Sequence, residues 1–207
     1  FVAKNDDFIS FVKELSEINN FNNSDLNKVK KTKMKSSKTV DECLVDLISK
    51  IGEKITFRRS NYFNSENVLN FSYVHSPIKK NLGKIGVLVS LKSNKPKKDL
   101  LEIGKQLAMH IAASSPLSID KDGLDTKLLE KEKEIIIEEL KNSGKDAKIV
   151  DKIALGKLNK FISDNTLLNQ EWIMEPKKKV KDVINEFAGK EKFIVKNFLR
   201  FKVGEGL

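Results

Sequence analysis

The sequence predicts an α+β protein with two subdomains, each a small antiparallel sheet flanked by helices, plus a protruding antiparallel helical hairpin (a coiled coil). Three observations predict this fold. Apolar residues recur at helical spacing over residues 40–51. They then alternate with polar residues over 55–58, 69–73 and 85–91, which is the period of strands. Helical spacing returns twice in residues 125–164, as in two helices joined by a turn.

Composition indicates a soluble globular protein. The 207 residues are enough for one large domain or two small ones, and 39% are hydrophobic against 33% charged. There is no signal-peptide pattern and no apolar run near the ~20 residues of a membrane span. We therefore predict a cytoplasmic protein without membrane contact. The one cysteine, Cys43, excludes an internal disulfide and is interpreted as a buried structural thiol.

The net charge of +10 raises the question of nucleic-acid binding. Only Arg58, Arg59 and Arg200 are arginines, and arginine is the residue that grips phosphates in bidentate fashion and stacks on bases. We interpret the lysines as spread over solvated faces, so direct nucleic-acid binding is not expected. An RNA- or ribosome-binding module driven by the lysines remains the alternative function.

The first 40 residues predict two short helices and a linker. Asn5 or Asp6 can cap the first helix, which ends at the Asn19-Asn20 pair. Ser24 can cap the second. Residues 28–38 carry six lysines and few apolar residues, so they indicate an exposed linker.

Residues 39–58 predict a capped helix followed by a strand. Thr39 and Glu42 have the spacing of a capping box, and Gly52 supplies the C-terminal stop. Ile55 and Phe57 alternate with polar residues in the predicted strand.

Two further strands and a helix complete the predicted core. Leu69–Tyr73 is one strand, and Ile85–Leu91 is apolar enough to be central. His75 falls at a turn predicted from Ser76-Pro77. A helix over residues 98–114 carries His110 beside its apolar stripe. That histidine is open to two interpretations, a satisfied buried side chain or a functional one.

The remaining residues predict the hairpin and a return to the sheet. Two apolar stripes flank a turn at Asn142-Ser143-Gly144. A short helix over 180–187 ends at Gly189, and a last strand covers 193–203.

Catalytic motifs are missing from the sequence. It has no phosphate-binding or dinucleotide-binding glycine loop and no Cys/His metal spacing. We therefore predict no catalytic residue, no metal site and no cofactor of the protein's own. An unrecognised small-molecule enzyme stays as a third possibility.

Several blocks in order resemble bacterial elongation factor Ts. Phe1-Val-Ala-Lys-Asn5 resembles that family's Thr-Asp-Phe-Val-Ala-Lys/Arg-Asn signature, although a bare Phe1 is also compatible with a frayed chain end. The other blocks are Ile51-Gly-Glu-Lys-Ile-Thr-Phe-Arg-Arg59, Ser72-Tyr-Val-His75, Gly86-Val-Leu-Val89, Ala108–Ser114, Asn169–Pro176 and Phe198–Gly206. In Asn169–Pro176, Trp172 replaces the family's Phe and its first Pro is absent.

The resemblance implies a nucleotide exchange factor for elongation factor Tu, not an enzyme. It implies that Phe1 enters the partner and loosens the GDP and Mg²⁺ bound there. The partner-binding residues it implies are Phe1, Val2, Ile51, Gly52, His75 and His110. A homodimer through the hairpin or the sheet is a further expectation.

The resemblance also implies a division of the chain. The expected parts are residues 1–66 (N-terminal subdomain, incomplete at its start), 67–120 (C-terminal subdomain, first part), 121–165 (hairpin insertion) and 166–207 (C-terminal subdomain, second part). The family's Thr-Asp and its N-terminal helical domain do not precede Phe1 here, so we expect a partial sequence.

Overall fold

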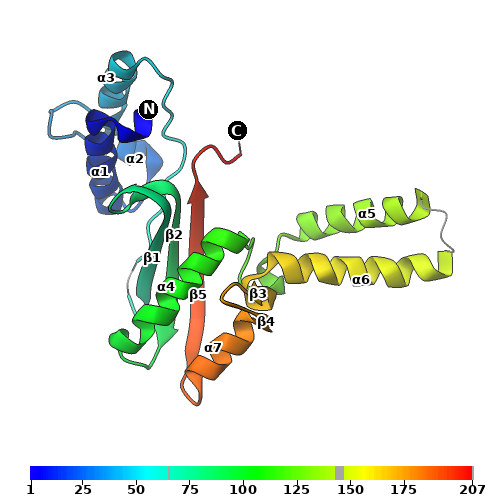
Figure 1. Ribbon diagram of the computed structural model, residues 1–207. Helices are drawn as coiled ribbons and strands as arrows, with labels where there is room; N and C mark the ends of the chain where they lie inside the picture. Colours follow the sequence, from blue (N-terminus) through cyan, green and yellow to red (C-terminus); the bar gives the residue numbers. More distant parts are fainter. Residues whose placement is uncertain (65, 143–146, 207) are drawn as a thin grey trace. The chain divides into compact units, whose positions relative to one another are not determined.

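The computed structural model describes residues 1–64, 66–142 and 147–206 (Figure 1). The chain forms two compact units, Phe1–Asn64 and Ser65–Leu207. Helices and two small antiparallel sheets together confirm the α+β class.

The first unit is helical. Its elements are η1 (Val2–Lys4), α1 (Asp6–Phe21), α2 (Leu26–Lys31) and α3 (Val40–Ile51). As predicted, Asn5 caps α1, and its Oδ1 accepts a hydrogen bond from the Phe8 amide at 3.0 Å. The helices enclose a small apolar core of Phe11, Leu15, Val29, Met34, Val40 and Leu47.

Some predicted details of this unit are wrong. α1 continues past the Asn19-Asn20 pair to Phe21. Asp25 rather than Ser24 caps α2, because its carboxylate reaches the Lys28 amide at 3.1 Å. The lysine-rich segment after α2 is not wholly exposed either. Met34 is buried in the core, and its amide donates to the Lys38 carbonyl at 2.8 Å.

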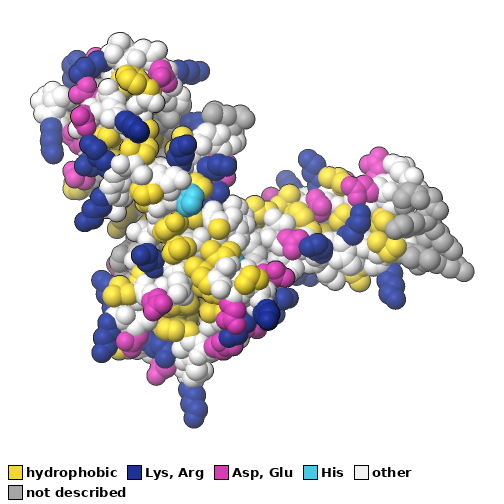
Figure 2. All heavy atoms as spheres, in the orientation of Figure 1, with side chains coloured by type: hydrophobic (Ala, Val, Ile, Leu, Met, Phe, Trp, Pro, Cys, Tyr) yellow, Lys and Arg dark blue, Asp and Glu magenta, His cyan; other side chains and the backbone are white. Residues whose placement is uncertain are grey.

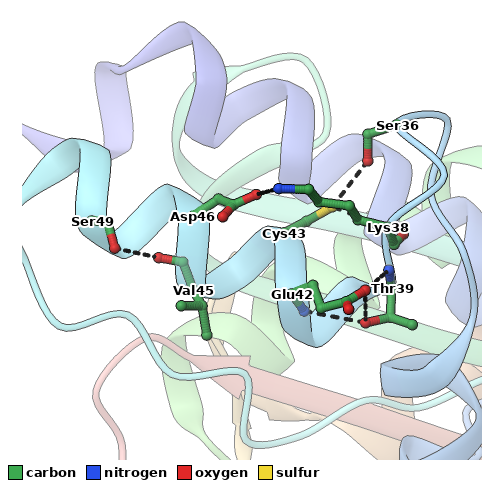
Figure 3. Close-up of polar contacts among 8 residues, drawn as sticks. All are labelled: Ser36, Lys38, Thr39, Glu42, Cys43, Val45, Asp46 and Ser49. Carbon is green, nitrogen blue, oxygen red and sulfur yellow. Dashed lines mark hydrogen bonds and ion pairs between the residues drawn. The ribbon is translucent and has the colours of Figure 1, made fainter.

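The capping box of α3 is confirmed (Figure 3). The Glu42 amide donates to Thr39 Oγ1 at 3.3 Å, and the Thr39 amide donates to Glu42 Oε2 at 2.7 Å. The Thr39 amide and the Thr39 hydroxyl, which also donates to Glu42 Oε2 at 2.8 Å, favour the charged carboxylate, so they lower the pKa of Glu42. Gly52 ends the helix at φ +78°, the left-handed conformation that glycine adopts most easily.

The strand predicted at residues 55–58 is not formed. Residues 53–64 contain no strand among those described. Ile55 and Phe57 instead lie against the helical core of the first unit. An extended segment that buries one side against helices shows the same alternation of apolar and polar residues as a strand. Both sheets therefore lie in the second unit.

The larger sheet has three strands in the order β1-β2-β5. These are β1 (Leu69–Lys79), β2 (Leu82–Ser93) and β5 (Phe193–Lys202), all antiparallel. As predicted, β2 is central, and Val87, Val89 and Leu91 on it are buried. β1 continues through the turn predicted beside His75. The left-handed Ser76 (φ 49°) and the register shift at Pro77–Lys79 show that this turn-like sequence makes a bulge.

Helix α4 (Lys97–Ser114) confirms the predicted helix and packs against β1 and β2 (Figure 1). Leu100, Ile103, Leu107 and Ile111 bury its apolar stripe in the main core. The helix ends at Ser114, and its C-cap Ser115 adopts the left-handed conformation at φ 49°, just before Pro116.

The helical hairpin consists of α5 (Thr126–Asn142) and α6 (Ala147–Asn165), which run side by side in Figure 1. Ile136, Leu140, Val150 and Ala154 form a small core of its own. The predicted turn includes Ser143 and Gly144, which lie outside the described residues.

Short elements connect the hairpin to the last strand. They are η2 (Lys121–Gly123), η3 (Leu167–Asn169), β3 (Glu171–Trp172), β4 (Glu175–Lys179) and α7 (Val180–Ala188). The short helix ending at Gly189 and the closing strand are confirmed.

Candidate partner-binding site

The side chain of Phe1 is 95% exposed. It precedes the single turn of η1, in which the Lys4 amide donates to the Phe1 carbonyl at 3.0 Å. The Asn5 amide donates to the Val2 carbonyl at 2.9 Å, so the chain passes from this turn directly into α1. Val2 itself is half-buried. A free aromatic ring thus stands on a backbone that is hydrogen-bonded to the start of a helix.

Ile51 and Gly52 end α3 at the same end of the first unit. An ion pair of 2.5 Å between Asp7 Oδ2 and Lys50 Nζ joins the first turn of α1 to the last turn of α3. Both side chains are largely exposed, so this pair contributes little to stability. The pair brings the start of α1, which directly follows η1, close to the end of α3, where Ile51 and Gly52 lie.

His75 belongs to the second unit, on β1. It lies opposite Ile85 in the ladder, and its side chain is exposed. Its Nδ1 lies 3.3 Å from the hydroxyl of Tyr73, on the same face of the strand. His75 is therefore available to a partner on a rigid strand rather than on the predicted turn.

His110 is fully buried, at 0% exposure. Its Nε2 lies 2.9 Å from Gln170 Oε1, and its ring stacks on Trp172 with the ring centroids 5.2 Å apart. Burial lowers the pKa of His110, and the bond to Gln170 offsets part of that effect. Two interpretations of His110 were left open above, and these contacts agree with the first of them, a buried histidine whose hydrogen bonds are satisfied. In this conformation its side chain reaches no surface that a partner could touch.

An open depression of about 350 Å³ lies on α3, lined by Lys38, Asp41, Glu42, Val45 and Asp46. Lys38 Nζ pairs with Asp46 at 2.6 Å (Figure 3), which raises the pKa of the lysine. The amine therefore stays charged and offers no base. Cys43 is only partly buried, contrary to its interpretation as a buried thiol, and its Sγ lies 3.1 Å from Ser36 Oγ.

The described residues contain no group of three or more His, Cys, Asp or Glu side chains placed to hold a metal ion. Within the same residues, no helix combines the length and the hydropathy that crossing a bilayer requires.

An exposed aromatic ring on a hydrogen-bonded turn is a candidate contact for another protein, because aromatic side chains are enriched at protein–protein interfaces. Comparison with known proteins identifies the family of the chain that carries this candidate site. The model of the family described as "Elongation factor TS" matches residues 1–205. The chain belongs to this family, and so to the elongation factors of protein biosynthesis.

Relatives named elongation factor Ts are similar along the whole chain. The protein of Rickettsia massiliae (strain Mtu5) is 38% identical over 211 residues, which cover 100% of this chain and 68% of the relative. That of Zymomonas mobilis subsp. mobilis is 37% identical over 209 residues, covering 100% and 68%. That of Gluconobacter oxydans (strain 621H) is 34% identical over 207 residues, covering 100% and 67%.

The sequence analysis missed the surroundings of His110. Gln170 and Trp172 were placed only within a block that resembles the family, with no link to a histidine 60 residues earlier. A buried glutamine needs hydrogen-bond partners, but its place in the sequence does not mark Gln170 as buried. Nothing in the spacing identifies which partner.

Proposed function

We propose that this protein promotes the release of GDP from elongation factor Tu during translation elongation, and that it does so by binding alone. The observation that carries the proposal is the 95% exposure of Phe1, an apolar ring held out on a hydrogen-bonded turn in a member of this family. Leaving such a ring in water is unfavourable, and a partner can bury it.

In the proposed mechanism, Phe1 enters the partner and displaces the elements that position Mg²⁺ and the phosphates of GDP. Burying one aromatic ring contributes a few kcal/mol at ~25 cal/mol per Å². Coupling between two ligands is reciprocal, so the protein that weakens nucleotide binding is itself displaced when nucleotide returns. Exchange becomes faster and the final equilibrium does not change.

The remaining parts of the proposed interface come from both units of the chain. Val2, Ile51 and Gly52 support Phe1 on the surface joined by the Asp7–Lys50 pair. His75 approaches the phosphate side of the partner, and the hairpin reaches a more distant domain of it. The division at 66, 120 and 165, the pairing of two copies through the hairpin or the sheet, and a location in the cytoplasm belong to the same proposal.

Direct contact with nucleic acid is not part of this proposal. On the face seen in Figure 2, Lys and Arg side chains are scattered among Asp and Glu. Such a mixture of charges gives a weaker positive electrostatic potential, and so a weaker attraction for nucleic acid, than a continuous basic stripe would.

The test is the release of a fluorescent GDP analogue from elongation factor Tu, with Phe1→Ala compared to the unsubstituted protein. Loss of the ring should slow release about tenfold or more at equal concentration, since 1.4 kcal/mol of lost interaction equals a factor of ten. The unsubstituted protein should keep its activity as salt is raised, because an apolar contact is not screened.

Phe21→Ala is the matched control. Phe21 is 87% exposed on the same unit, at the opposite end of α1, so its loss should leave release unchanged. Equal effects of the two variants, or no acceleration by the unsubstituted protein, would contradict the mechanism. Activity that falls steeply with salt would favour RNA or ribosome binding instead.

A further inference from the structure

Gln170 connects two helix ends with one buried side chain. Helix α4 ends at Ser114 and helix α6 at Asn165, and the last carbonyls of a helix have no partner within it. The Gln170 Nε2 amide donates to the Ser114 carbonyl at 3.2 Å and to the Asp164 carbonyl at 2.7 Å. Gln170 is only 6% exposed, so water cannot easily replace these bonds.

These two bonds also determine the tautomer of His110, that is, which ring nitrogen carries the proton. Because both amide hydrogens of Gln170 face carbonyls, its Oε1 faces His110 and can only accept. His110 must then carry its proton on Nε2. That leaves Nδ1 unprotonated, and the Ile173 amide points at it over 3.4 Å. A second proton on the ring would sit on Nδ1, where its N–H would face the N–H of Ile173 and the bond would be lost.

The same residues surround the base of the hairpin. The chain enters the hairpin after Leu117–Ser118 and leaves it at Asn165–Thr166. There the Leu117 amide donates to the Asn165 carbonyl at 2.9 Å, and Ser118 bridges to Thr166. Above this base, the helices α5 and α6 pack mainly on each other. The Leu167 and Leu168 amides continue this base, with bonds of 2.9 Å to the Ser118 and Ile119 carbonyls. The Gln170 bonds add a direct link between the last turns of α6 and α4.

We propose that His110 and Gln170 are positioning residues: their buried hydrogen-bonded pair holds the last turn of α6 against the last turn of α4 and so fixes the helical hairpin at its base. His110 acts on a partner through the hairpin and not by contact. This part rests on the proposed function, in which the hairpin reaches the partner.

Protonation of His110 should loosen this junction. No charged side chain of the described residues contributes to the shift of its pKa, which comes from burial and Gln170. The charged groups on the packed elements include Asp164 on α6, paired with Lys160 at 2.9 Å, the exposed Glu171 on β3, and Arg200 on β5, whose Nε donates to the Ala112 carbonyl at 3.2 Å. The folded pKa lies below the ordinary 6.5, so the unfolded chain takes up the proton first. The stability that depends on neutral His110 is therefore complete above pH ~6.5 and is lost as the pH falls below it.

Distances between spin labels on α4 and α6 test the proposal. The labels replace the exposed Leu101 and Leu155 in a Cys43→Ser background of the full chain. At pH 7.5 the distance distribution should be narrow in this labelled parent and in His110→Gln, whose amide can still donate to Gln170 but cannot titrate. It should broaden in Gln170→Met, which keeps the length of the side chain and loses its amide. An equally narrow distribution in Gln170→Met would overturn the proposal.

A pH titration provides a readout that needs no destabilising variant. Trp172 is the one tryptophan of the chain and stacks on His110, and a protonated imidazole quenches indole fluorescence. Below pH 6.5 the fluorescence of the protein should fall and the label distances should broaden together, with far-UV circular dichroism unchanged. His110→Gln should show neither change. Quenching without broadening would show that the pair does not hold the hairpin.

Nucleotide release separates this proposal from the function on which it rests. With elongation factor Tu, Gln170→Met should raise the half-saturating concentration and leave the maximal release rate, which depends on Phe1, unchanged. If the unsubstituted protein accelerates nothing, the proposed function fails, while the label distances still decide the role of the pair. A reduced maximal rate with a narrow distance distribution would contradict the positioning role.

Discussion

Leu107→Ala is expected to lower the free energy of unfolding of the second unit by about 2–5 kcal/mol. Leu107 lies on the face of α4 that packs against the sheet, and it is 0% exposed. Truncation removes buried apolar atoms and leaves a cavity that the surrounding core fills only in part. Urea unfolding followed by Trp172 fluorescence reports on this unit, because Trp172 belongs to the same core.

Leu101→Ala on the same helix is the control for that experiment. Leu101 is 53% exposed, so the same substitution removes little buried surface. Its effect should stay within about 0.5 kcal/mol, as for most surface substitutions. If the two variants unfold at the same urea concentration, the packing of α4 described here is wrong.

Gly104→Leu should be almost as damaging, although it adds a good helix former. A Cβ at Gly104 would lie less than 3.0 Å from the ring of Phe71, which itself packs against the core. The nearest ring atom is Cγ, which is only two bonds from the Phe71 Cα, so the ring cannot move aside cheaply. We expect a loss of about 3 kcal/mol from this overpacking, the upper part of the usual range. Thermal unfolding followed by the fluorescence of Trp172 measures it.

Gly156→Leu in α6 is the matched substitution, with the opposite expected sign. Nothing lies within 4 Å of a Cβ at Gly156, and the position is exposed. The same change should therefore stabilise the helix by about 0.5–1 kcal/mol through helix propensity alone. A loss at Gly156 as large as that at Gly104 would mean that the crowding by Phe71 is not the cause.

The sequence predicted the helices and the sheet best where local chemistry decides the structure. The capping box of Thr39 and Glu42 and the left-handed Gly52 depend on neighbours three to four residues away, and both are found as predicted. The segment at Ile55–Phe57 was predicted wrongly because its alternation reflects burial on one side, which helices provide as well as a sheet does. Ser76-Pro77 was assigned to a turn because a bulge uses the same residues.

The candidate site was predictable only in part, for a different reason. Resemblance gave the residues Phe1, Ile51 and Gly52, but not the Asp7–Lys50 pair that brings their helices together. His110 could not be placed from its own helix, because the residue that satisfies it, Gln170, lies 60 positions away. Contacts of that kind follow from the tertiary fold, and no periodicity encodes them.

The small separate core of the hairpin has a consequence for motion. Among the described residues, the buried side chains of the cluster that holds α5 to α6 all lie within the hairpin, so the two helices can come apart without disturbing the sheet. Such sub-global opening costs less than global unfolding. In deuterium-labelling experiments, the amides of α5 should exchange well before those of β2, which has a strand on either side. The helical hairpin would then open and re-form when it meets a partner, while the three-stranded sheet stays folded.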